Sequence, residues 1–180
     1  MNKECTSRAV FFDRDGVLNK DKHYLYCISD MEWIPGAREA IAWLHTHGWK
    51  VIVVTNQSGV ARGYYTEEDV KKLHAYMASE AEKAGGAIDD FFYCPHLKGA
   101  PVKAYDKECG CRKPAPGMIL QAMKKYGLLP SECFLIGDGQ RDVEAAERAG
   151  IQGILFTSGR LDDFLQACLK QRNSGKEIHG

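Results

Sequence analysis

Two aspartates set two residues apart follow a short apolar run near the start of the chain. Asp13 and Asp15 come directly after residues 9–12, and Gly16 lets the backbone turn away tightly behind them. Such a pair can divide the work of phosphoryl transfer. One carboxylate attacks phosphorus and forms an acyl phosphate, while the other protonates the leaving oxygen and later takes a proton from water. A capped loop at a strand end is the alternative, because aspartate is common in such turns.

Two carboxylates that face a phosphate dianion need positive charge between them, because like charges in a closed site repel. Mg²⁺ would supply this charge, and it takes oxygen ligands. Asp138 follows another apolar run and is the expected ligand beside the Asp13 carboxylate and the backbone carbonyl of Asp15. Asp142 would orient these ligands or cap the next helix, although an acidic residue in a first helical turn is also common on a solvated surface.

Phosphate oxygens also need fixed donors and a cation. Thr55 ends the second apolar run, and its hydroxyl with the amides of residues 56–58 would donate to these oxygens. A plain Ser/Thr or Asx turn is the alternative. Lys113, which follows Arg112, offers the cation for the phosphoryl group, whereas an Arg-Lys pair by itself is also ordinary protein surface.

Two pairs of metal ligands lie in one stretch, Cys94 with His96 and Cys109 with Cys111. Three sulfur ligands and one nitrogen ligand suit tetrahedral Zn²⁺, and a closed set leaves no position for water, so a structural site is predicted. Free thiols or a disulfide are the alternatives, but the paired spacing favours zinc. The metal would fix the loop 94–111 and, with it, the direction of the two cations that follow. The remaining cysteines show no partner pattern: Cys5, Cys27, Cys133 and Cys168.

These residues follow short apolar runs that alternate with amphipathic segments, a rhythm typical of an α/β fold with a parallel sheet. Strands are expected over residues 9–12, 51–54, 91–93, 134–136 and 154–156. Helices are expected over residues 38–47, 66–84, 116–127, 141–149 and 161–170. Because loops converge at the carboxyl ends of parallel strands, the candidate residues should meet at one edge of the sheet.

Length and composition limit the classes of protein to which this chain can belong. A chain of 180 residues suits one domain over residues 1–180, with a polar, frayed tail at 171–180. Lys plus Arg and Asp plus Glu both number 24, which argues against a nucleic-acid partner. No apolar run approaches the ~20 residues that cross a bilayer, and seven cysteines with a metal-like pattern fit a reducing compartment, so a soluble cytoplasmic protein is expected. No apolar stripe is left over, which favours a monomer.

The chain resembles the haloacid dehalogenase superfamily of phosphatases. The resemblance rests on four motifs in this order: DRDG at 13–16, TNQSG at 55–59, CRKP at 111–114 and GD at 137–138. It covers residues 10–159, and the cysteine pairs narrow it to a branch that holds heptose 1,7-bisphosphate 7-phosphatases and histidinol-phosphate phosphatases. It implies a three-layer, Rossmann-like sheet with helices on both faces, a minimal cap and a zinc-stapled loop.

The resemblance also implies roles for individual residues. Asp13 would be the nucleophile and Asp15 the acid and base, Thr55 and Lys113 would stabilise the phosphoryl group, and Arg112 would help to recognise the substrate. The substrate pocket would be lined by Asp21, Lys22, His23, Tyr24, Asn56, Gln57 and Ser58. The implied substrate is a small phosphorylated sugar, the implied cofactors are Mg²⁺ and structural Zn²⁺, and the implied product feeds bacterial ADP-heptose synthesis for lipopolysaccharide.

One position departs from the pattern: Gly139 stands where heptose members of the branch often carry lysine. A second phosphate on the substrate needs a further cation, for which Arg62, Lys22 and Arg112 are candidates. Histidinol phosphate is the alternative substrate, and a DNA 3'-phosphate end is a distant one because the net charge is zero.

Two classes outside the phosphatases also use some of these residue types. A receiver domain combines clustered acids, Mg²⁺, threonine and lysine, but it places the phosphorylated aspartate mid-chain, ahead of threonine and lysine. A zinc adaptor needs only the cysteine pairs and leaves Asp13, Thr55, Lys113 and Asp138 unexplained. The phosphatase interpretation accounts for the most residues.

Overall fold

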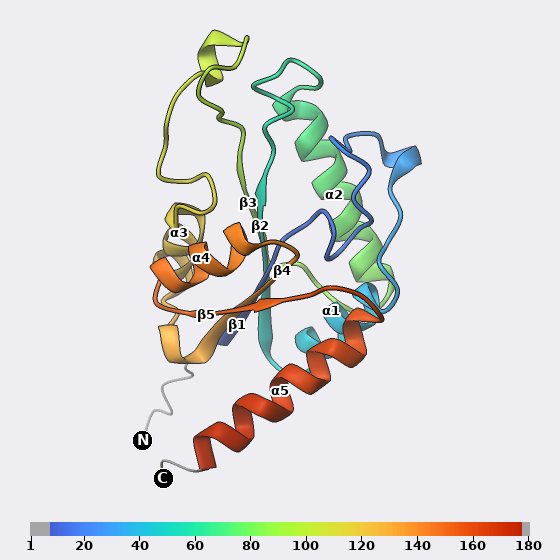
Figure 1. Cartoon of the computed structure of the whole chain (residues 1–180). Helices are drawn as coiled ribbons and strands as arrows, with labels where there is room; N and C mark the ends of the chain where they lie inside the picture. Colours follow the sequence, from blue (N-terminus) through green and yellow to red (C-terminus); the bar gives the residue numbers. More distant parts are fainter. Residues whose placement is uncertain (1–7, 178–180) are drawn as a thin grey trace.

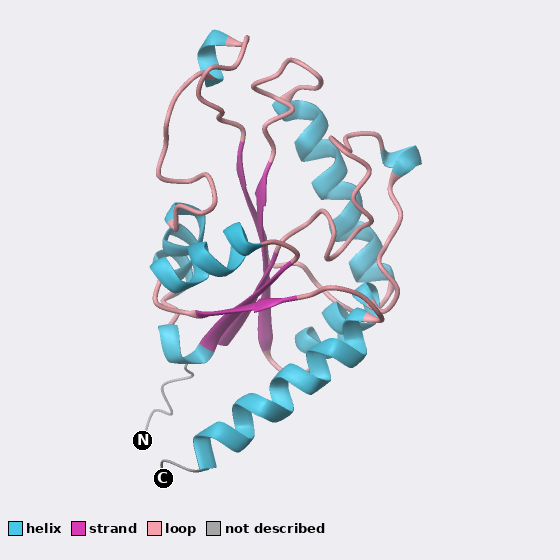
Figure 2. Ribbon diagram, in the orientation of Figure 1, coloured by secondary structure: helices cyan, strands magenta, loops and turns pink. Residues whose placement is uncertain are grey.

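Parallel strands form the single sheet of the computed structural model, which describes residues 8–177 of the chain (Figures 1 and 2). The strands are β1 (Arg8–Phe12), β2 (Trp49–Asn56), β3 (Asp90–Cys94), β4 (Cys133–Gly137) and β5 (Gln152–Leu155). Their order across the sheet is β3-β2-β1-β4-β5. The predicted α/β fold is confirmed.

Helices cover both faces of the sheet, which makes three layers (Figure 1). One face packs against α1 (Ala37–Thr46), α2 (Glu67–Lys83) and α5 (Leu161–Glu177). The other face packs against α3 (Gly117–Tyr126) and α4 (Gln140–Arg148). Short 3₁₀ turns lie at Ile28–Asp30, Lys103–Tyr105 and Pro130–Glu132. The inner strands β1, β2 and β4 are buried on both sides along most of their length, which explains why they read as continuous apolar runs rather than as an alternation.

Helix α2 begins with a capping box. The Thr66 hydroxyl accepts from the Asp69 N–H at 3.2 Å, and the Asp69 carboxylate accepts from the Thr66 N–H at 2.8 Å. Two N–H groups that the helix cannot satisfy are thereby paired. The cap fixes the start of α2 directly after the loop that follows β2.

Most elements differ from the expected ranges by one or two residues at their ends, and two of the differences have a clear cause. Helix α5 continues to Glu177 instead of ending at residue 170, because Arg172 donates to the Gln152 side chain at 2.6 Å and lies over the Phe134 ring. Strand β5 ends at Leu155, since the Phe156 side chain turns into the core beneath the sheet. Residues 178–180 and Cys5 lie outside the described residues.

The strand order reverses direction between β1 and β4. The chain builds β1, β2 and β3 outward on one side, then crosses back to add β4 and β5 on the other. Loops leaving neighbouring strands in opposite directions open a crevice at their carboxyl ends, where ligands of such sheets bind. Among residues 8–177, no helix is long and apolar enough to cross a membrane.

Candidate active site

A buried lysine joins two carboxylates at this crevice. The Nζ of Lys113 lies 2.9 Å from Asp13 Oδ1 and 2.6 Å from Asp142 Oδ1, and it donates to the Val54 carbonyl at 2.8 Å. Three contacts use the three N–H bonds of an ammonium group. Burial works against the charge of Lys113, but the two carboxylates outweigh it and raise the lysine pKa, so the side chain stays charged.

Asp13 ends its strand in a buried position. Burial raises the pKa of Asp13, and the Lys113 charge opposes that rise. Its Oδ1 also accepts from the Arg14 N–H at 2.7 Å. Further positive charge near Asp13 would therefore favour the ionised carboxylate, the form that a nucleophile needs.

The carboxylate of Asp138 has the surroundings of a metal ligand. Ligand atoms of Asp13, Asp138 and Asp142 lie within 4.8 Å of one another, and Asp138 Oδ1 is buried without a hydrogen-bond partner. A Cβ at Gly16 would come within 2.2 Å of Asp138 Oδ2, so only glycine fits there. Burial and the neighbouring Asp142 raise the pKa of Asp138. Arg141 Nη2 lies 4.0 Å from Asp138 Oδ1, too far for a hydrogen bond. A buried oxygen that accepts no hydrogen bond, among further carboxylates, fits a hard divalent cation.

Asp142 caps the next helix, one of the two roles that the sequence left open, and it also contacts Lys113. Its Oδ1 pairs with Lys113, and its Oδ2 accepts from the Gly139 N–H at 3.1 Å, which caps α4. The side chain has 0% exposure, so it is not a solvated surface acid. Gly137 gives it room, because a Cβ at that position would lie 2.2 Å from the Asp142 Cβ.

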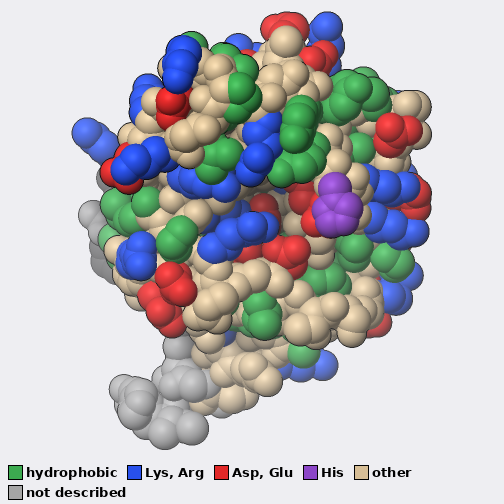
Figure 3. All heavy atoms as spheres, turned by 45° about the horizontal axis from the view of Figure 1, so that its top comes forward, with side chains coloured by type: hydrophobic (Ala, Val, Ile, Leu, Met, Phe, Trp, Pro, Cys, Tyr) green, Lys and Arg blue, Asp and Glu red, His purple; other side chains and the backbone are tan. Residues whose placement is uncertain are grey.

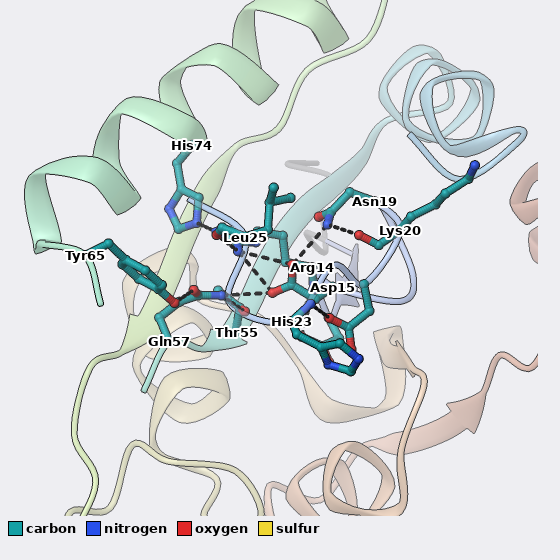
Figure 4. A network of polar contacts seen from close by, with 12 residues as sticks. Arg14, Asp15, Asn19, Lys20, His23, Leu25, Thr55, Gln57, Tyr65 and His74 are labelled. Atoms are coloured by element: carbon teal, nitrogen blue, oxygen red, sulfur yellow. Dashed lines mark hydrogen bonds and ion pairs between the residues drawn. The ribbon is translucent and has the colours of Figure 1, made fainter. Parts of the chain in front are cut away.

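Three side chains donate to the Asp15 carboxylate (Figure 4). Its Oδ1 accepts from Arg14 Nη2 at 3.1 Å and from Asn19 Nδ2 at 2.9 Å, and its Oδ2 accepts from Gln57 Nε2 at 3.0 Å. Arg14 is fully buried and contacts His74 Nε2 at 3.2 Å. Because arginine only donates, this histidine nitrogen accepts, and burial together with the Arg14 charge lowers the His74 pKa well below its usual value.

Strand β2 contributes Thr55 and Asn56. Thr55 is buried, and its Oγ1 accepts from Gln57 Nε2 at 2.8 Å. Asn56 makes two 3.0 Å hydrogen bonds with the backbone of Lys113, one to its carbonyl and one from its N–H. The predicted phosphate-binding strand end is thereby fastened to the segment that carries the lysine.

A cleft of about 270 Å³ opens beside these groups. It is lined by Asp15, Asp21, His23, Tyr24, Asn56, Gln57, Ser58, Arg62, Tyr65, Arg112 and Arg141. Figure 3 shows basic side chains gathered around a hollow that holds acidic ones. The left-handed backbone of His23 and Tyr24, with φ of 53° and 63°, turns the loop at this point, and the Asp21 carboxylate accepts from the His23 N–H.

Most of the residues expected in the pocket line this cleft, but Lys22 does not. Its ammonium group forms an ion pair with Glu32, which Lys20 also contacts. Sequence reasoning missed Tyr65 and Arg141. The available signal for Arg141 was its place three residues after Asp138, in the first turn of the helix that follows β4.

The cysteine and histidine ligands form one compact cluster. Sulfur–sulfur separations among Cys94, Cys109 and Cys111 are 3.0–3.4 Å, and His96 Nδ1 lies 3.5 Å from Cys111 Sγ and 3.7 Å from Cys94 Sγ. These separations exceed the ~2.05 Å of a disulfide bond. They approach the edges of a tetrahedron with metal–sulfur bonds of about 2.3 Å, so the donor set fits Zn²⁺.

Hydrogen bonds connect the cluster to the cleft. The Cys94 carbonyl accepts from the Gln57 N–H at 2.8 Å, and the His96 carbonyl accepts from Arg112 Nη1 at 3.4 Å. The Gly110 carbonyl accepts from the Gly117 N–H at the start of α3. The segment that carries Arg112 and Lys113 is therefore held on both sides.

Clustered carboxylates with a buried lysine, at the carboxyl edge of a parallel sheet, define a site suited to hydrolytic phosphoryl chemistry. The chain belongs to the haloacid dehalogenase-like hydrolase family, whose model matches residues 19–150. The family expected from the four motifs is thereby confirmed.

Within this family, the chain is similar to several curated relatives and solved structures. The chain is 44% identical over 161 residues to D-glycero-beta-D-manno-heptose-1,7-bisphosphate 7-phosphatase of Rhodopseudomonas palustris, with 89% of each chain covered. It is 41% identical over 144 residues to the alpha-anomer enzyme of Photorhabdus laumondii, with 80% of this chain and 79% of that one covered. A D,D-heptose 1,7-bisphosphate phosphatase from B. bronchiseptica, solved with magnesium and phosphate, matches with a TM-score of 0.76 and 34% identity over 89% of this chain and 86% of that one.

Proposed function

We propose that the protein hydrolyses the C7 phosphate of D-glycero-D-manno-heptose 1,7-bisphosphate through an aspartyl phosphate on Asp13. The observation that carries this proposal is the buried Asp13–Lys113–Asp142 arrangement beside Asp138 Oδ1, a buried oxygen that accepts no hydrogen bond from the described residues. The names of the relatives supply the substrate, since enzymes for both anomers of this heptose bisphosphate are similar over most of the chain.

Asp13 is the nucleophile in this proposal. The Lys113 ammonium and the Arg14 N–H both bind Oδ1, so we assign Oδ2 to the attack on phosphorus. A carboxylate fixed by two donors enters the reaction with little left to reorganise. Lys113 also neutralises part of the charge that the phosphoryl group brings.

Asp15 is the proposed general acid and base. It would give a proton to the leaving sugar oxygen and then take one from the water that hydrolyses the acyl phosphate. Arg14, Asn19 and Gln57 hold its carboxylate in one orientation. Thr55 would donate its hydroxyl hydrogen to a phosphoryl oxygen from the end of β2.

Mg²⁺ is the proposed catalytic cation, and a relative of this chain has been solved with it. The carboxylates of Asp13 and Asp138 and the backbone carbonyl of Asp15 would hold it. When bound, it supplies the positive charge that lets a phosphate dianion approach a carboxylate. The donor set at Cys94, His96, Cys109 and Cys111 would hold a structural Zn²⁺.

Arginines around the cleft are suited to the second phosphate of a bisphosphate. Arg62, Arg112 and Arg141 all line it, and guanidinium groups match phosphate oxygens in pairs. Lys22 is not retained as a candidate for binding the second phosphate, because its ammonium group pairs with Glu32. We also propose that the chain acts as a single-domain monomer in the bacterial cytoplasm, where thiols stay reduced.

Phosphate release in the presence of Mg²⁺ tests the function. Catalytic efficiency is compared on both anomers of heptose 1,7-bisphosphate and on histidinol phosphate. We expect at least a tenfold preference for a heptose, which corresponds to about 1.4 kcal/mol in the transition state. A preference for histidinol phosphate would contradict the proposed substrate while leaving the catalytic groups in place.

A further inference from the structure

The side chain of Gln57 lies buried between two groups of the proposed mechanism. Its Nε2 donates to Asp15 Oδ2 at 3.0 Å and to Thr55 Oγ1 at 2.8 Å, and its Oε1 accepts from the Tyr65 hydroxyl at 2.6 Å (Figure 4). Only 2% of the residue is exposed. The amide therefore joins the end of β1 to the end of β2.

The direction of each of these hydrogen bonds follows from chemistry. In its ionised form, which takes a proton from water in the proposed mechanism, the Asp15 carboxylate only accepts. The NH₂ group of Gln57 therefore faces Asp15, and the amide oxygen faces Tyr65. The Tyr65 hydroxyl must donate to that oxygen. The second amide hydrogen goes to Thr55 Oγ1, which leaves the threonine's own hydrogen to donate elsewhere.

We propose that Tyr65 and Gln57 form a positioning relay, in which Tyr65 fixes the Gln57 amide and the amide orients both Asp15 and Thr55. The inference rests on the proposed function, because it gives these two residues their roles as acid and base and as phosphoryl donor. Gln57 was expected among the substrate-binding residues. Both hydrogens of its NH₂ group are donated to protein groups, so its side chain acts through Asp15 and Thr55.

The position of Asp15 depends on this amide. Arg14 and Asn19 hold Oδ1, while among the described residues Oδ2 is contacted by Gln57 and, at 3.1 Å, by the same Arg14 nitrogen. Loss of the hydrogen bond from Gln57 would leave Oδ2 with the Arg14 contact alone. A displacement of an acid by about 1 Å can lower a rate by on the order of 100-fold, so one hydrogen bond at this point has a measurable effect.

The Tyr65 ring is fixed independently of its hydroxyl. It stacks on Tyr26 with ring centroids 5.3 Å apart, and it lies so close to Gly59 that a Cβ there would be 2.2 Å from the ring. A phenylalanine at position 65 keeps these ring contacts and removes the hydroxyl, which donates to Gln57 and accepts from the Gly59 backbone. Tyr65 also lines the cleft, so a direct contact with substrate is the competing explanation.

A double-mutant cycle separates the two explanations. Tyr65→Phe, Gln57→Met and the double variant are compared with the wild type for kcat and KM on heptose bisphosphate with Mg²⁺. We expect kcat to fall about fivefold for Tyr65→Phe and about 50-fold for Gln57→Met, with KM within about twofold of wild type. The double variant should be no slower than Gln57→Met, because Tyr65 acts through Gln57.

Tyr126→Phe is the matched control. Its hydroxyl also donates to a carboxylate, at 3.0 Å to Asp90 Oδ2. This contact lies at the first residue of β3, at the end of the strand away from the cleft. This variant should keep the wild-type kcat even where the melting temperature falls. A general loss of stability would instead lower activity in both tyrosine variants alike.

Other outcomes overturn the relay. If the two losses of kcat multiply in the double variant, Tyr65 acts independently of Gln57 and contacts the substrate. A raised KM with unchanged kcat in Tyr65→Phe would mean the same. If Gln57→Met does not fold, an unchanged kcat in Tyr65→Phe alone contradicts the proposal. Should the wild type hydrolyse para-nitrophenyl phosphate but not heptose bisphosphate, the proposed function fails, and the same cycle on the aryl phosphate still decides the relay.

Discussion

The two candidate metal sites differ in what the protein itself supplies to shape them. The carboxylate site is built from strand ends more than a hundred residues apart, and the buried Lys113 pairs with two of its acids. The cysteine and histidine ligands come from one stretch, 94–111, and contact chiefly one another. The first site is thus shaped by charges of the protein, whereas the proposed Zn²⁺ would hold the second site together. Losing a group at the first should affect chemistry, and losing one at the second should affect stability as well.

Replacing the proposed nucleophile should give the largest effect. Asp13→Asn keeps the volume and leaves Lys113 paired with Asp142, so the fold should persist, but the amide cannot attack phosphorus. We expect turnover to fall by about 10⁴-fold or more. Phosphate release measures the loss, and the melting temperature serves as the control for folding. Activity near the wild-type level would remove Asp13 as the nucleophile.

Breaking the cysteine cluster should give a smaller loss of activity together with a loss of stability. Cys109→Ser removes one sulfur ligand, so zinc content should drop, the melting temperature should fall by at least about 5 °C, and kcat/KM should fall about tenfold. Metal analysis, thermal unfolding and phosphate release report the three quantities. Cys27→Ser is the matched control and should leave the zinc content unchanged. Purified wild-type protein without zinc would refute this account of the loop.

Removing a cation from the cleft should give the smallest effect. Arg141→Gln should raise KM for the bisphosphate about fivefold, because one charged contact with the second phosphate is lost. The same change at Lys22, which lies outside the cleft and pairs with Glu32, should alter KM by less than about twofold. Heptose 7-phosphate, which lacks the second phosphate, is the control substrate for both variants. Equal KM changes in the two variants would contradict the assignment of Arg141.

Much of the site could be predicted from strand ends. Asp13, Thr55 and Asp138 each follow a buried apolar run, and the carboxyl edge of a parallel sheet brings such residues together wherever the runs are recognised. The order of strands and the crevice between β1 and β4 then follow from the fold class. The expected range of β5, 154–156, lies one to two residues after the observed Gln152–Leu155, because an edge strand carries a weaker apolar signal.

Contacts between distant side chains could not be predicted in this way. Arg14 reads as part of a short motif, yet it is fully buried and its partner His74 lies sixty residues away. Lys22 reads as part of a pocket loop, but its direction is set by Glu32 ten residues on. Such pairings depend on side-chain packing, which period and spacing do not encode.

The hydrogen bonds between the cysteine loop and the loop after β2 have a consequence for local motion. The Gln57 N–H is bonded to the Cys94 carbonyl, and the Val102 N–H is bonded to the Ala61 carbonyl. Segments joined in this way open together, as one cooperative unit of local unfolding. The hydrogen-exchange rate of the Gln57 backbone N–H therefore reports how tightly the cysteine loop is closed. Loss of the proposed metal from that loop would alter how often the substrate cleft loses its shape.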